Sequence, residues 1–166
     1  METKIPFYNL LNMFLTGLIF TGCCIVLFYE KIVLLTDSAF FDSIKSMNVG
    51  LETIITICFC AIIYEIGYII NRIGSFMEDF LKLIKLIPFD NDYKNFNDKS
   101  AKLPVLSTLS REYALSRTSM TLFLMMTIIS SVHCHRIFAV VMLALTILFY
   151  FSMKKHALKI VTLMKD

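Results

Sequence analysis

Glu65 is the residue whose type and position are best suited to chemistry. It follows twelve uncharged residues and precedes Arg72 by seven positions, or roughly 10 Å along a helix. A carboxylate inside a membrane is costly and often marks an ion or proton path. The sequence supports two interpretations. Glu65 lines a path, binds a proton or pairs two helices; or it lies close enough to the headgroups to reach water, or pairs with Arg117.

His133, Cys134 and His135 form a second group with chemical potential. Two imidazoles and a thiolate are all metal ligands, but a zinc site usually needs a further ligand and groups that orient the first ones. On the same side of a membrane the sequence offers only Asp37 and Asp42. We therefore expect no metal site, and we treat these residues as polar turn residues.

Motifs of common enzymes are missing from the sequence. There is no phosphate-binding GxxxxGK[ST] loop, no GxSxG turn and no HExxH helix. Four of the five cysteines lie inside apolar segments and form no CxxC pair, as expected for small buried hydrophobic residues. We predict no catalytic residue, no cofactor and no enzymatic activity.

Composition places the chain in a membrane. Of its 166 residues 57% are hydrophobic and 17% are charged, and the mean hydropathy is +0.72; soluble domains contain about 25% charged residues. A net charge of +3 is too small to indicate direct nucleic-acid binding. The sequence predicts an all-α integral membrane protein.

Four apolar segments are long enough to be spans, which we place at about 8–29, 47–70, 115–133 and 137–153 of a single membrane domain, 1–166. They form two pairs, and the second pair is a tight hairpin. The first segment also resembles a lipoprotein signal, ending at Cys23, but the apolar run continues through 25–28, so an uncleaved helix is preferred. Between the first two spans we expect a short external segment, with an interfacial helix capped by Asp37 or Ser38.

The second span is predicted to continue out of the membrane as one helix over 51–87, about 55 Å long. Its later half has the spacing of an amphipathic helix. The apolar positions are Ile69, Ile70, Ile73, Phe76, Met77, Phe80, Leu81 and Ile84, and the polar ones are Arg72, Glu78, Asp79, Lys82 and Lys85. We expect the apolar stripe to pack on 105–114 of the same chain or on another subunit.

Positive charge orients the predicted spans. Of the 16 Lys and Arg residues, one precedes the first span, eight lie in 72–117 and four in the tail, so thirteen fall on one side. The positive-inside rule then predicts that both termini, the helical loop region 71–114 and the basic tail 154–166 are cytoplasmic, in a plasma or inner membrane. Within the loop region, 88–104 is expected to be a polar linker without regular structure.

A charged group precedes the third span and consists of Arg111, Glu112, Tyr113, Ser116 and Arg117. Basic side chains at that position anchor on anionic headgroups. Docking of a cytoplasmic partner or an anionic ligand is the alternative. Together with Tyr64, Glu65 and Arg72, we take Arg111 and Arg117 as candidate membrane-junction or subunit-contact residues.

The layout of these features resembles a known group of proteins. Two helix pairs, a second helix that carries Tyr64-Glu65-Ile66-Gly67, a polar loop, and the charged group before the third span are similar to small four-span membrane subunits of prokaryotic antiviral defence systems. Examples are the membrane component of Kiwa and membrane accessories of CRISPR loci. The chain departs from better-known defence effectors in having no recognisable nucleotide-sensing domain.

The resemblance implies a homo-oligomer that senses or perturbs the lipid bilayer together with a soluble cytoplasmic partner, and it implies no functional residue. Such an oligomeric effector or accessory subunit is our first hypothesis. A small ion channel or transporter-like protein with Glu65 lining the path is the second. A membrane enzyme that acts through His133 and His135 is the third, and it is the least supported because neither a ligand set nor a triad is complete.

Overall fold

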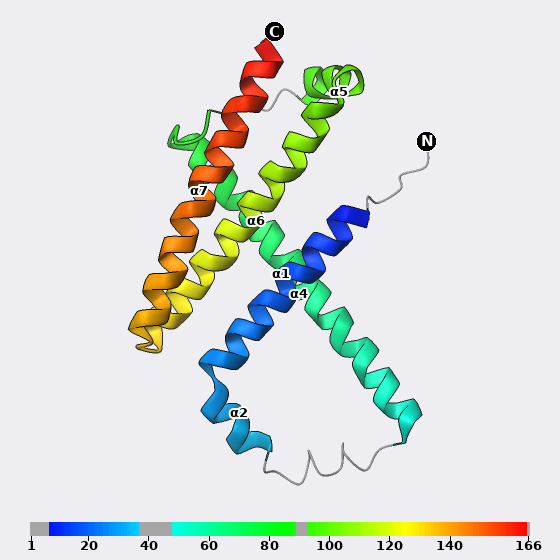
Figure 1. Cartoon of the computed structure of the whole chain (residues 1–166), viewed down its shortest axis with the longest axis vertical. Helices are drawn as coiled ribbons and strands as arrows, with labels where there is room; N and C mark the ends of the chain where they lie inside the picture. Colours follow the sequence, from blue (N-terminus) through cyan, green and yellow to red (C-terminus); the bar gives the residue numbers. More distant parts are fainter. Residues whose placement is uncertain (1–6, 37–47, 89–92, 166) are drawn as a thin grey trace. The chain divides into compact units, whose positions relative to one another are not determined.

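The structure, a computed structural model, is built from α-helices in the residues that it describes, 7–36, 48–88 and 93–165. Figure 1 shows these helices along the chain. They are α1 (Phe7–Leu27), α2 (Tyr29–Thr36), α4 (Val49–Leu83), α5 (Tyr93–Lys102), α6 (Pro104–Val132) and α7 (Arg136–Lys165). The predicted all-α class is confirmed.

Four of the helices, α1, α4, α6 and α7, are long and apolar enough to cross a membrane. This supports a multi-pass membrane protein. Three of them are longer than a span requires, with 35 residues in α4, 29 in α6 and 30 in α7, against about 20 for a 30 Å hydrocarbon core. Part of each long helix is therefore free to extend beyond the hydrocarbon.

The long helix α4 ends at Leu83, four residues before the predicted end. Lys85 has a φ of 56°, and its N–H donates to the carbonyl of Lys82 at 2.9 Å. The N–H of Leu86 donates to the carbonyl of Leu81 at 3.0 Å. This pair of bonds is a Schellman motif, in which one left-handed residue turns the chain away from the helix axis. The predicted boundary was wrong because Lys85 carries no sequence signal for that conformation.

A second Schellman motif forms the turn between α6 and α7. Cys134 has a φ of 61°, and its N–H donates to Ser131 at 3.2 Å, while the N–H of His135 donates to Ser130 at 3.0 Å. The position held by Cys134 is most often glycine, because a side chain there is strained. The turn joins two helices that pack along each other, with the Phe123 and Phe149 rings stacked at 5.5 Å.

Helix α5 corrects the expectation that 88–104 lacks regular structure. Residues Tyr93–Lys102 are helical although few of them are apolar. Phe96 packs against the core of the second unit, and Lys99 Nζ donates to the carbonyl of Met164 at 2.8 Å. A cation at a helix C-terminus is favourable. These tertiary contacts compensate for a local sequence that is typical of a loop.

Two predicted features fall outside the described part of the chain. The interfacial helix with a cap at Asp37 or Ser38 lies outside it, and so does the start of the polar linker at 89–92. In the preceding segment that is described, α2 follows α1 almost directly and begins with Glu30 in its first turn.

The chain divides into two compact units, 1–69 and 70–166. In the first unit, α1 approaches α4 at two glycines. A Cβ atom on Gly17 would overlap the carbonyl of Ile63, and one on Gly67 would overlap the carbonyl of Met13. Small residues allow two helix backbones this approach in membrane proteins. The two glycines belong to different helices, so no spacing along the sequence marks them as a pair.

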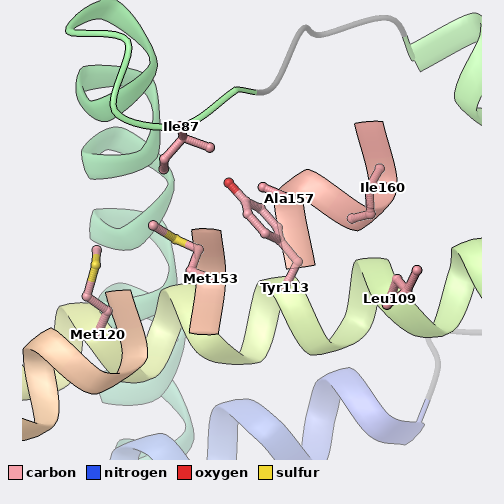
Figure 2. Close-up of a cluster of buried hydrophobic side chains, with 7 residues drawn as sticks. All are labelled: Ile87, Leu109, Tyr113, Met120, Met153, Ala157 and Ile160. Atoms are coloured by element: carbon pink, nitrogen blue, oxygen red, sulfur yellow. The ribbon is translucent and has the colours of Figure 1, made fainter. Parts of the chain in front are cut away.

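The core of the second unit lies among α6, α7 and the segment that follows α4. Figure 2 shows the core residues, with Tyr113 projecting from α6 toward Ile87 and Ala157. The cluster comprises Ile87, Leu109, Tyr113, Met120, Met153, Ala157 and Ile160. Next to it, the hydroxyls of Ser116 and Ser152 lie 3.0 Å apart and join α6 to α7. This packing fixes the part of α6 that carries Arg117.

Candidate functional site

The most elaborate polar arrangement in the second unit centres on Arg117 of α6. Its Nη1 donates to Glu78 Oε2 at 2.6 Å, and its Nη2 donates to Asn71 Oδ1 at 3.0 Å. Glu78 is buried, with 6% of its surface exposed, although it is charged. A buried charge is tolerated only when it is paired and hydrogen-bonded, and Glu78 meets both conditions.

Lys82 completes the charge balance of this arrangement. Its Nζ lies 2.6 Å from the second carboxylate oxygen of Glu78 and 3.9 Å from Asp79. Two acidic and two basic side chains, those of Glu78, Asp79, Lys82 and Arg117, therefore share one neutral cluster. Both oxygens of the Glu78 carboxylate accept a charge-assisted bond, the strongest kind of hydrogen bond in proteins. We call these four residues, with Asn71 and Thr118, the Arg117 cluster.

Small groups allow α4 to reach α6 at the Arg117 cluster. Thr118 Oγ1 lies 2.9 Å from Asn71 Oδ1 and 2.9 Å from the carbonyl of Ala114, so its one proton is shared between two acceptors. A Cβ atom on Gly74 would be 3.0 Å from Thr121 Oγ1. A larger residue at position 74 would push α4 away and stretch the bonds of Arg117.

Helical spacing explains why these residues meet. Asn71, Gly74, Ser75, Glu78 and Lys82 recur every three or four positions, so they lie on one face of α4. This stripe of small and polar residues faces α6. In the sequence, Glu78 and Lys82 fall on the polar face of an amphipathic helix, and only the apolar stripe was predicted to pack on another segment. The available signal was the combination of two small residues with an i, i+4 ion pair on that same face.

Part of the apolar stripe of α4 remains uncovered in the described chain. Met77 and Leu81 pack against the core cluster. Phe76, Phe80 and Leu83, on another side of the helix, are 75%, 60% and 80% exposed. We call these three residues the α4 face. The stripe therefore divides into a portion that packs inside the chain and a portion available to lipid or protein.

The structure distributes the five candidate junction residues among different environments. Tyr64 is half-buried and Glu65 is exposed, both on the α4 segment of the first unit. Arg72 and Arg111 are exposed side chains of the second unit, and Arg117 is half-buried. Of the five, Arg117 is the one that belongs to the Arg117 cluster.

The partner of Arg117 differs from the one that the sequence suggested. One interpretation of the sequence paired Arg117 with Glu65, but the carboxylate that binds Arg117 is that of Glu78. Glu78 was overlooked because it lies among alternating charges that usually mark a solvent-exposed helix. Its position in a charged stretch therefore gave no sign that Glu78 is the buried carboxylate among the residues that the structure describes.

The turn between α6 and α7 presents His133, Cys134 and His135 as exposed side chains. In the described residues no three or more His, Cys, Asp or Glu side chains come together to hold a metal ion. The five cysteines are free thiols, and Cys58, Cys60 and Cys134 are exposed. Cys58 and Cys60 were expected to be buried; in this chain alone they are not.

These observations define a class of protein. Four helices long and apolar enough to span a membrane, with a closed ion-pair cluster between two of them, support a multi-pass helical membrane protein. The cluster binds its own groups together and stabilises the packing of α4 on α6. Comparison with protein-family models, with curated proteins and with solved structures finds no match to this chain.

Proposed function

We propose that the chain is a non-enzymatic subunit of a membrane assembly, an oligomeric effector or accessory subunit that senses or perturbs the bilayer. A soluble cytoplasmic protein is the expected partner, and prokaryotic antiviral defence is the setting that the resemblance implies. The α4 face carries this proposal. Phe76, Phe80 and Leu83 are exposed, next to a polar cluster whose charges are already neutralised within the chain.

The depth of the Arg117 cluster supports the need for a partner. Arg117 lies fifteen residues before Val132, which is about 22 Å along α6. With the α6–α7 turn at one membrane surface, Arg117 lies about 8 Å short of the inner limit of a core about 30 Å thick. Glu78 is bonded to Arg117 and shares its depth. Leu83 is five residues, or about 8 Å, further along α4, so the α4 face ends at the edge of the hydrocarbon, where exposed apolar side chains favour contact with another protein surface.

The same reasoning revises the predicted topology. We place the inner boundary of α4 beyond Glu78, near Leu83, instead of at residue 70, with both termini still cytoplasmic because most Lys and Arg residues fall on that side. The amphipathic extension of α4 is correspondingly shorter. Its polar face supports α6, and its apolar α4 face is the proposed contact with a second copy of the chain.

The size of the purified protein tests the proposal. We expect the wild type in mild detergent to be an oligomer by light scattering coupled to size exclusion. Replacement of Phe76, Phe80 and Leu83 together by alanine should reduce the protein mass to that of a monomer. As a matched control, Val140→Ala with Leu148→Ala removes comparable exposed side chains from α7 and should leave the mass unchanged. A monomeric wild type without a co-purifying protein contradicts the proposal.

Glu65 favours a second candidate function, a small ion channel or transporter-like protein. Its carboxylate is exposed on α4 and lies thirteen residues before Glu78, about 20 Å along the helix. With Glu78 about 22 Å from the outer membrane surface, Glu65 lies close to that surface, where its carboxylate would stand at the mouth of a path. Glu65→Gln should then alter ion flux in vesicles, whereas Glu52→Gln, near the start of α4, should not. Unchanged flux in Glu65→Gln rejects this candidate.

A further inference from the structure

A groove between α6 and α7 combines an apolar floor with a basic rim. Its volume is about 700 Å³, within the range of about 300–1,000 Å³ typical of small-molecule sites. The floor is formed by Val105 and Leu109 of α6 and by Phe151 and Leu158 of α7. Val105, Phe151 and Leu158 are exposed large apolar side chains. A ligand here would contact mainly hydrocarbon groups.

The rim of the groove carries one sign of charge. Lys154, Lys155 and Lys159 line it, and the whole of α7 contains no Asp or Glu. On the α6 side, Glu112 Oε2 lies 3.3 Å from His156 Nδ1, and neither residue lines the groove. The lysines are therefore available to an anion at the mouth, where the three charges reinforce one another.

The groove is continuous with a predicted span. Phe151 belongs to the uncharged run that ends at Met153, and Lys154 follows directly. The groove thus begins at Phe151, next to the hydrocarbon, and its other apolar lining residues lie level with the lysines or beyond them. An occupant must be apolar toward the membrane and anionic at its surface. Basic pockets between helices on the cytoplasmic side bind anionic lipid headgroups by this combination.

We propose that this groove binds one anionic phospholipid of the adjacent leaflet, with an acyl chain on Phe151 and Leu158 and the phosphate among Lys154, Lys155 and Lys159. The inference goes beyond the proposed function, because it requires a membrane but no oligomer. A monomeric protein would leave it standing. It adds a lipid specificity that an assembly of this kind could use to sense membrane composition.

Tryptophan fluorescence tests the site directly, because the chain contains no Trp. Leu158→Trp introduces one reporter on the groove floor, and Leu148→Trp introduces one at an exposed position of α7 away from the groove lining. Brominated phosphatidylglycerol and brominated phosphatidylcholine are titrated into each protein in detergent. For Leu158→Trp we expect half-maximal quenching at about tenfold lower phosphatidylglycerol than phosphatidylcholine. Leu148→Trp should not distinguish the two lipids.

Charge removal separates the site from a general effect of net charge. In the Leu158→Trp protein, Lys154→Gln with Lys155→Gln and Lys159→Gln should abolish the tenfold preference. A second triple variant, Lys31→Gln with Lys85→Gln and Lys102→Gln, loses the same charge at exposed positions outside the groove lining and should keep it. Melting temperature and elution volume verify that both variants are folded.

Four results would overturn the inference. Equal quenching of Leu158→Trp by the two lipids shows that the rim selects no anionic lipid. Equal loss of preference in both triple variants shows a response to net charge alone. Removal of the preference by soluble glycerol phosphate at millimolar concentration shows an anion site that needs no acyl chain. Protection of Leu158→Trp from both lipids, while Leu148→Trp is quenched, shows that protein covers the groove and also overturns it.

Discussion

The ion pair between Arg117 and Glu78 gives the sharpest test of how α4 is held on α6. Arg117→Met removes the guanidinium and keeps a long apolar side chain. Glu78 then remains buried with Lys82 as its one basic neighbour in the Arg117 cluster. Loss of one partner from a buried pair costs about 3–5 kcal/mol when the remaining charge is uncompensated. Because Lys82 retains one of the two carboxylate oxygens, we expect about 2 kcal/mol.

A double-mutant cycle isolates the pair from the other effects of each substitution. Glu78→Gln, Arg117→Met and the double variant are unfolded in mixed micelles of detergent and denaturant, with helix content followed by circular dichroism. The double variant leaves no unpaired carboxylate at position 78, so it should be more stable than Arg117→Met alone. We expect a coupling free energy of about 1.5–3 kcal/mol, the range for charge-assisted bonds.

Arg111 provides the matched control for this cycle. It lies six residues before Arg117 on the same helix and is exposed, so Arg111→Met should change stability by less than about 0.5 kcal/mol. A coupling free energy below about 0.5 kcal/mol between positions 78 and 117 would refute the reasoning. An equal loss of stability in Arg111→Met would refute it as well, because exposed and clustered arginines would then be equivalent.

Three further substitutions test separate contacts by the midpoint of thermal unfolding in detergent. Gly17→Leu should lower the midpoint by several degrees, because its side chain would overlap the carbonyl of Ile63. Gly22→Leu has open space around it and should not lower the midpoint. Equal losses in the two variants would contradict the close approach of α1 to α4. Cys134→Gly should raise stability by about 1 kcal/mol, since it relieves a left-handed residue in the turn, and no gain would argue against that conformation. Lys99→Met should lower the free energy of unfolding by about 1 kcal/mol, because Lys99 loses its hydrogen bond to the end of α7. An unchanged midpoint would show that α5 is held by apolar contacts alone.

The sequence predicted the helices well where composition controls the result. A long uncharged run specifies a membrane-spanning segment almost regardless of the order of its residues. The four predicted spans correspond to the four helices that are long and apolar enough to cross a membrane. Boundaries were less accurate. The end of α4 depends on a left-handed conformation at Lys85, and α5 depends on contacts with Phe96 and Lys99, which no local pattern reveals.

The candidate site was predicted only in part, for a related reason. Arg117 was identified because a charge next to an apolar run is conspicuous. Its partners Asn71 and Glu78 were not, because their chemistry depends on which side of α4 meets α6. Hydrophobic periodicity assigns apolar residues to the core, and α4 departs from that rule by burying Glu78 and exposing Phe76. In a membrane protein this reversal is reasonable, since lipid or a second copy of the chain covers an apolar face, and polar groups must find partners inside the protein.

The Arg117 cluster and the α6–α7 groove together constrain how such a protein could respond to its membrane. The cluster is neutral and bonded within itself, so a change in lipid charge acts on it weakly. The groove has an unbalanced rim of three lysines on α7, and that helix shares the buried core with Tyr113, four residues before Arg117. Lipid binding in the groove would therefore bias the packing of α6 directly. The groove is therefore the element that responds more strongly to lipid charge, while the Arg117 cluster keeps α4 and α6 together when a lipid binds.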